Sequence, residues 1–118
     1  MSASEYLMML KRVLVKGRSV IEECPEHYKV YLPTEYNDLW EELRSRRISV
    51  DIIVFLPGQH QEYGISKILM KDRYIVRESG RYKVYLSKAY LDIWREISQQ
   101  NQTVDLLIVS KVWFLFRG

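Results

Sequence analysis

The apolar positions of residues 28–56 follow three patterns in succession. In residues 28–32 apolar side chains alternate with Lys29 and Tyr31, which predicts a strand with two distinct faces. Apolar residues then recur at the i, i+3, i+4 and i+7 spacing of one helical face. These helical positions are Tyr36, Leu39, Trp40 and Leu43. Residues 50–56 form a near-continuous apolar run of strand length, which predicts a buried strand.

The same three patterns recur in residues 82–110, which align with residues 28–56 without a gap. Over the 29 aligned positions we count 11 identities, and Trp40 and Trp94 occupy equivalent places. The second helical face is formed by Tyr90, Ile93, Trp94 and Ile97. Two matched tryptophans within matched apolar patterns indicate that the chain is an internal duplication.

Three related short segments precede, separate and follow the two copies. They read KRVLVKGR in residues 11–18, SKILMKDR in residues 66–73 and SKVWFLFR in residues 110–117. We interpret each segment as a strand, so that a last strand is expected at Val112–Phe116. The first two strands run on toward residues 19–21 and 74–76, and a one-residue gap between the turns that follow restores the register of the copies.

The repeat predicts an α+β fold built from two tandem β-β-α-β repeats, one over about residues 11–65 and the other over about residues 66–118. No Gly/Ser linker separates the copies, and about 50 residues bury too little apolar surface to fold well alone. We therefore expect one fused domain over residues 1–118. In it the copies would be related by a pseudo-twofold axis and packed as one β-barrel or sheet with two helices.

Local signals refine the repeat unit. Pro33 followed by Thr34 suits a turn into a helix, with Thr34 as the expected capping residue. Asp51 and Asp105 open the two buried strands, and we expect them to serve turns.

Composition sets loose limits on the class of protein. With 118 residues and 47% apolar side chains the chain can bury a real core, and its net charge of +3 permits an anionic partner without requiring one. Cys24 is the single cysteine, which excludes an internal disulfide and fits a reducing compartment. The first residues do not form a signal peptide, and the apolar run of residues 104–116 is too short to span a bilayer. A soluble, cytoplasmic protein is expected.

The sequence offers little that suits catalysis. His27 and His60 lack Cys, Asp or Glu neighbours at metal-ligand spacing, and we expect both in solvated loops. The glycines are isolated, so a phosphate-binding Gly-rich loop is missing. Cys24 has only His27 near it in sequence, and the second copy does not repeat this pair. We therefore predict a protein that is not an enzyme and that uses no cofactor and no metal.

Basic residues near the expected hairpins are the candidate functional residues. They are Lys16, Arg18, Lys71, Arg73, Arg77 and Arg81, together with Lys29 and Lys83 on the alternate strand faces. Lys29 beside Tyr31, and Lys83 beside Tyr85, place a cation next to an aromatic ring, as on strand surfaces that bind nucleic acid. An ordinary solvent face with lysine stems lying over tyrosine rings has the same pattern, so both interpretations stay open.

The order of these elements resembles the AbrB/SpoVT/MazE swapped-hairpin DNA-binding domain. In the second half the resemblance rests on the following segments: residues 73–77 (first strand), Gly80-Arg81 (turn), residues 82–86 (second strand), 89–97 (helix), 104–109 (third strand) and 112–116 (fourth strand). In the first half, residues 28–33 keep the apolar-Pro ending of that family. In the family, two β-β-α-β-β units, usually from two chains, interlock. The resemblance implies a pseudo-dimer within one chain.

The resemblance also implies a function. In that family basic residues of the first hairpin and its loop contact DNA, and by position these are Arg73, Arg77, Arg81 and Lys83. We therefore expect a protein that binds double-stranded DNA and resembles a transcriptional regulator. The alternative is a protein-interaction module on the same fold, either antitoxin-like or an assembly factor, with a homodimer or another protein as partner.

The two expected hairpin loops differ in charge. Residues 22–27 carry three Glu and neither Lys nor Arg, whereas residues 77–81 carry two Arg and one Glu. Because phosphate contacts dominate affinity for DNA, we expect the second half to make most of the contact with DNA. The acidic loop would be left for a protein partner or a second copy of the chain.

Overall fold

The computed structural model describes residues 12–58 and 66–110. These residues form an α+β fold with two four-stranded antiparallel sheets. The strands are β1 (Arg12–Ser19), β2 (Ile21–Cys24), β3 (His27–Tyr31), β4 (Val50–Phe55), β5 (Lys67–Arg73), β6 (Val76–Glu78), β7 (Arg81–Tyr85) and β8 (Thr103–Ser110). The helices are α2 (Asn37–Ser45) and α3 (Leu91–Gln99), each preceded by a 3-10 turn, η1 (Thr34–Tyr36) and η3 (Lys88–Tyr90).

Each sheet takes two strands from each repeat. Sheet A has the order β1-β8-β4-β5 and sheet B has the order β2-β3-β7-β6. The central pairs join equivalent strands, and Val30 lies opposite Val84 just as Ile53 lies opposite Leu107. Exchanging the two repeats therefore leaves the strand order and the central registers unchanged. The barrel alternative is wrong for the described residues, because their strands form two open sheets.

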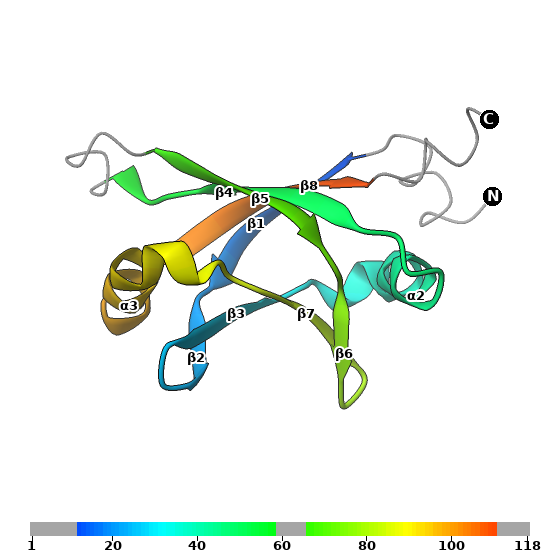
Figure 1. Cartoon of the computed structure of the whole chain (residues 1–118), viewed down its shortest axis with the longest axis horizontal. Coiled ribbons are helices and arrows are strands. Elements are labelled where there is room, and N and C mark those ends of the chain that lie inside the picture. Colours follow the sequence, from blue (N-terminus) through cyan, green and yellow to red (C-terminus); the bar gives the residue numbers. More distant parts are fainter. Residues whose placement is uncertain (1–11, 59–65, 111–118) are drawn as a thin grey trace.

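The first strand of each repeat was expected to be continuous, and it is instead divided between the sheets. β1 ends at Ser19 and β2 begins at Ile21, while β5 ends at Arg73 and β6 begins at Val76. Val20 and Ile75, at the two breaks, are buried. Each repeat is therefore β-β-β-α-β. In Figure 1 sheet A lies at the top, sheet B lies below it, and one helix stands at each side.

A bulge interrupts the regular pairing of each edge strand of sheet A. Gly17 in β1 and Asp72 in β5 have positive φ angles of 66° and 56°, and the strand registers shift at these points. The carboxylate of Asp105 accepts the Gly17 N–H at 2.9 Å, and that of Asp51 accepts the Asp72 N–H at 3.0 Å. The two aspartates thus bind the backbone at the bulges, which explains their place in both repeats.

The core lies between the sheets and contains side chains from both repeats. Trp40 and Trp94 are fully buried, as the helical pattern predicted. Their indole N–H groups donate to the carbonyl oxygens of Pro33 and Ser87, at 2.9 and 2.7 Å. The expected cap at Thr34 is wrong, because Pro33 is the N-cap and no side chain caps that helix.

Each helix packs against the hairpin of the other repeat. Helix α2 lies against β6 and β7, and α3 lies against β2. The turns of the two hairpins, β2–β3 and β6–β7, both project at the end of the molecule opposite sheet A (Figure 1). The strand expected at residues 112–116, and His60, lie outside the described residues. Neither described helix is long and apolar enough to cross a membrane.

Candidate functional site

The two hairpins of sheet B have different turns. In the first, Pro25 and Glu26 connect the strands, Glu26 has a φ of 67°, and the register shifts between Glu22 and Cys24. In the second, Ser79 and Gly80 both have positive φ, which is typical of a two-residue hairpin turn. The extra residue of the first repeat is thus taken up as a bulge. His27, expected in a turn, is the first residue of β3.

Lys29 and Lys83 meet two glutamates on the outer face of sheet B. The Lys29 Nζ lies 3.2 Å from Glu23 and 3.3 Å from Glu78, and the Lys83 Nζ lies 2.6 Å and 3.2 Å from the same two carboxylates. Tyr31 donates its hydroxyl to Glu78 at 2.6 Å, and Tyr85 donates to Glu23 at 2.9 Å. We call these six residues the Lys–Glu cluster. The lysine side chains are only 7% and 4% exposed.

The contacts within the cluster stabilise the charged forms of both lysines and both glutamates. Hydrogen bonds from Lys83, Tyr85 and Lys29 lower the pKa of Glu23 to about 2. Hydrogen bonds from Tyr31 and then from the two lysines lower the pKa of Glu78. Contact with Tyr31, followed by Glu23 and Glu78, raises the pKa of Lys29 against the effect of its burial. Burial acts to lower the pKa of Lys83, but its hydrogen bonds to Glu23, Tyr85 and Glu78 raise it overall.

These shifts determine what the Lys–Glu cluster can do. Two lysines and two glutamates cancel in charge, and neither amine is free to reach a phosphate. Each pKa moves away from neutrality, whereas a general acid or base works best with a pKa near the operating pH. The cluster therefore joins the two hairpins and fixes their relative position. Of the two interpretations of Lys29 and Lys83, the contacts favour an internal role over a phosphate-binding one.

The exposed cations on the hairpin side belong to the second repeat. Arg77 in β6 and Arg81 in β7 are both exposed. The Arg81 guanidinium carbon lies 3.6 Å from the centre of the Tyr31 ring, which orients the group while leaving it accessible to solvent. On the first hairpin the exposed residues include Glu22 and Glu26. The hairpin side thus has a basic tip and an acidic tip.

The other four predicted basic residues lie elsewhere. Arg18 and Arg73 are half-buried at the ends of β1 and β5, and the Arg18 Nε donates to the Tyr31 carbonyl at 2.8 Å. The buried Arg73 Nε has no hydrogen-bond partner within the described part of the chain. Lys16 and Lys71 are exposed on β1 and β5 in sheet A, remote from the hairpin turns. The eight predicted basic residues thus lie in three regions, which are the Lys–Glu cluster, the second hairpin and the edge strands β1 and β5 of sheet A.

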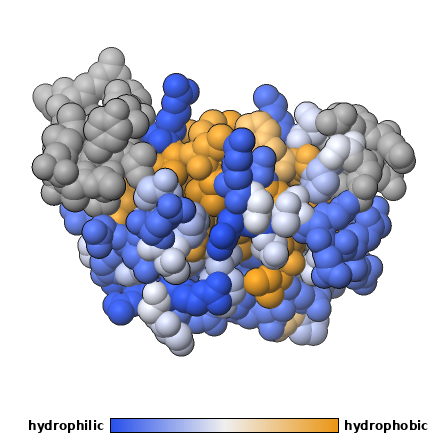
Figure 2. Space-filling model, turned by 180° about the vertical axis from the view of Figure 1, so that it is seen from behind, coloured by the Kyte–Doolittle hydropathy of each residue, from blue (hydrophilic) through white to orange (hydrophobic). Residues whose placement is uncertain are grey.

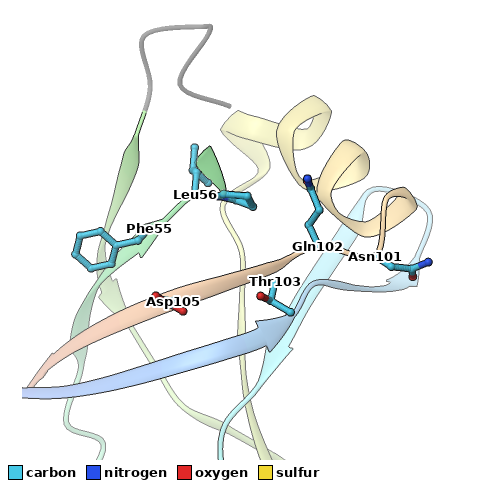
Figure 3. A pocket seen from close by; sticks show the side chains of 7 residues that line it. Phe55, Leu56, Asn101, Gln102, Thr103 and Asp105 are labelled. Atoms are coloured by element: carbon cyan, nitrogen blue, oxygen red, sulfur yellow. The ribbon is translucent and has the colours of Figure 1, made fainter. Parts of the chain in front are cut away.

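A shallow pocket lies beside the ends of β4 and β8. Its volume is about 450 Å³, and its lining residues are Phe55, Leu56, Pro57, Asn101, Gln102, Thr103 and Asp105 (Figure 3). The one carboxylate in this lining, that of Asp105, already accepts the Gly17 N–H. Among residues 12–58 and 66–110, no group of His, Cys, Asp and Glu side chains could hold a metal ion. The pocket therefore brings together no set of catalytic groups.

Glu23 and Glu78 are the residues that sequence reasoning missed. The one-residue gap in the repeat alignment places them at equivalent positions, and this was the available signal. Their role depends on contacts between repeats, because each carboxylate binds the lysines of both copies. No protein-family model, curated protein or solved structure matches this chain.

Proposed function

We propose that this chain is a non-enzymatic DNA-binding protein, similar to a transcriptional regulator, that contacts duplex DNA through its second hairpin. The observation that carries the proposal is the pair of exposed arginines, Arg77 and Arg81, on a hairpin that projects from the molecule (Figure 1). Arginine on a strand surface binds phosphate through a fork of N–H donors. The stacking of Arg81 on Tyr31 reduces the conformational freedom that binding would otherwise remove.

The packing of the repeats supports the resemblance to swapped-hairpin domains. Each helix lies against the hairpin of the other repeat, and the two hairpins form one sheet. This interlocking is what the resemblance implies for two β-β-α-β-β units, here joined in one chain as a pseudo-dimer. The pseudo-twofold axis would pass through the Val30/Val84 and Ile53/Leu107 pairs.

The charges on the hairpin side define how DNA would bind. Because the Lys–Glu cluster is neutral, the exposed arginines of the second hairpin supply the positive charge there, and the first hairpin presents Glu22 and Glu26. One chain would therefore make about two strong phosphate contacts, which predicts weak binding with a log–log salt slope of about 1.8. A second chain bound alongside would place two basic hairpins on the DNA and restore a symmetric contact.

The test is fluorescence anisotropy of a labelled random duplex, titrated with protein at several salt concentrations. R77Q/R81Q should lose most of the binding and reduce the salt slope by about 1.8, which is two contacts at about 0.9 each. The matched control is R46Q/K88Q, which removes two exposed cations, one just after α2 and one in η3, and should leave the slope near that of the wild type. Thermal melts of both variants establish that they are folded.

Equal losses in the two variants would show a nonspecific response to net charge and would contradict the assigned site. Failure of the wild type to bind any duplex at low salt would instead favour the second candidate function, a protein-interaction module that is antitoxin-like or an assembly factor. The observation that favours this candidate is the acidic first tip, where Glu22 and Glu26 are exposed and would repel phosphate.

A further inference from the structure

Sheet A exposes an apolar row that crosses all four of its strands. Leu14 pairs with Leu107, Leu107 with Ile53, and Ile53 with Leu69, so these side chains lie in one line on the outer face. Leu14 and Leu69, at its two ends, are 51% and 54% exposed. Contiguous apolar surface of this kind marks an interaction site more often than scattered leucines do.

The apolar surface extends beyond the four residues of the row. Phe55 is 37% exposed on β4, and Val109 is half-buried on β8 beside the row. Figure 2 shows apolar surface gathered at the end of the molecule formed by sheet A, with hydrophilic side chains standing around it. This end is opposite the hairpin turns, so a partner bound here would leave the second hairpin accessible.

Four cations frame the row, two on each side of it. Arg12 and Lys71 border one side, Lys16 and Lys67 border the other, and all four are exposed. The face also carries carboxylates: those of Asp51 and Asp105 accept backbone N–H groups at the bulges, and Asp72 is exposed in the β5 bulge. The corners of the face are therefore positive.

The charged corners argue against a second copy as the occupant. If two copies stacked these faces about a twofold axis parallel to the row, Arg12 would lie over Lys16 of the other copy. If the axis ran along the strands, Arg12 would lie over Lys71 instead. In both arrangements, positive side chains of the two copies face each other at all four corners, and their repulsion opposes dimerisation through this face.

We propose that the outer face of sheet A binds an acidic amphipathic helix of a partner protein. With strands about 4.8 Å apart, the row from Leu14 to Leu69 spans about 14 Å, and a helix covers that length with about ten residues. Its apolar stripe would lie on the row, and carboxylates on both borders of the stripe would reach the four cations. This helix-on-surface mode is independent of the DNA contact assigned to the hairpin.

The probe is a labelled 14-residue helical peptide with one leucine stripe bordered on both sides by Glu, titrated with the full chain in an anisotropy assay. The control peptide keeps the leucine stripe and replaces every bordering Glu by Lys. The Glu-bordered peptide should bind at least about tenfold more tightly, a difference that corresponds to 1.4 kcal/mol, and added salt should reduce the difference.

Variants locate the site. L14S/L69S should weaken binding of the Glu-bordered peptide at least about tenfold. R12Q/K16Q/K67Q/K71Q should bring the affinities of the two peptides together. The control Y74S changes a residue that is 58% exposed but lies outside the row, and it should leave binding unchanged. Melting curves establish that each variant is folded.

Several outcomes would overturn the proposal. They are equal binding of the two peptides by the wild type, no binding of the Glu-bordered peptide, and unchanged binding by L14S/L69S. Binding to anionic phospholipid vesicles in place of the peptide would assign the face to a membrane surface. Self-association of the wild type that L14S/L69S abolishes, without peptide binding, would assign it to a second copy.

Discussion

Tyr82 of the second repeat donates its hydroxyl to Glu41 of the first repeat at 2.5 Å, and this bond ties helix α2 to strand β7. Arg44 holds the same carboxylate through two further bonds, at 2.7 and 3.0 Å. Hydrogen bonds from Arg44 and then Tyr82 lower the pKa of Glu41 to about 2. The contact belongs to neither repeat alone, so it stabilises the interlocked arrangement rather than the individual units.

Replacing Tyr82 with Phe tests this contact. The ring of Tyr82 is buried and would stay in place, so the main loss is a hydrogen bond to a charged acceptor. We expect Y82F to lower the free energy of unfolding by about 1.5–3 kcal/mol, as measured by urea denaturation. Y74F, at an exposed tyrosine, is the matched control and should change stability by less than about 0.5 kcal/mol. Similar small effects from both variants would show that water can replace the Tyr82 hydroxyl as a donor to Glu41 without loss of stability.

The lowered carboxylate pKa values predict how stability depends on pH. Glu23 and Glu41 have pKa values of about 2 in the folded chain against an ordinary 4.5, and the pKa of Glu78 is also lowered. A lowered pKa contributes stability that is fully present above 4.5 and is lost as pH falls toward 2. Urea melts should therefore show nearly constant stability from pH 7 to about 5 and a steep decline from about pH 4.5 downward.

The variant E23Q separates the Lys–Glu cluster from the other carboxylates. At pH 7 it should be less stable than the wild type, because Lys83 loses its shortest ion pair while its side chain stays buried. Its stability should fall less between pH 5 and 3, since one lowered pKa has been removed. A decline as steep as that of the wild type would show that Glu23 does not contribute to the acid sensitivity.

The matched tryptophans give the largest expected losses of stability. Trp40 and Trp94 have no exposed surface, and each also donates a hydrogen bond to the carbonyl of the residue just before its helical segment. W40A and W94A should each destabilise the chain by about 3–5 kcal/mol, the usual cost of truncating a large core side chain. A melting temperature within a degree or two of the wild type for either variant would contradict this core role.

Much of the fold could be predicted from periodicity. The helical faces containing Trp40 and Trp94 and the buried strands follow from patterns within one repeat. The break at Val20 could not be predicted in this way, because it lies where the strand passes from one sheet to the other, and that division depends on the packing of both repeats. The ion pairs of Lys29 could not be predicted from one repeat either, because one of its two carboxylate partners, Glu78, comes from the other repeat.

Charge is reversed between the repeats at two pairs of equivalent positions. Glu41 on α2 is equivalent to Arg95 on α3, and Arg77 on β6 is equivalent to Glu22 on β2. Glu41 and Arg77 both act on Tyr82, whereas Glu22 and Arg95 both contact Tyr28. Unlike charges therefore meet at both tyrosines, Tyr82 and Tyr28, where a helix packs against the hairpin of the other repeat. A repeat packed against its own copy would place Glu22 against Glu41, or Arg77 against Arg95.

A double-mutant cycle on the Tyr28 side tests whether this complementarity contributes to stability. R95E places two carboxylates beside the Tyr28 hydroxyl and also removes the ion pair of Arg95 with Asp92, while E22R places two guanidinium groups there. Each single change should cost about 1 kcal/mol. E22R/R95E restores an unlike pair in the opposite orientation and should be more stable than the sum of the single losses predicts, with the loss of the Arg95–Asp92 pair remaining, as measured by urea denaturation. A double variant as unstable as the sum of the singles would show that the two side chains do not interact. Recovery would establish that charge, in addition to the shared apolar core, selects the pairing of unlike repeats.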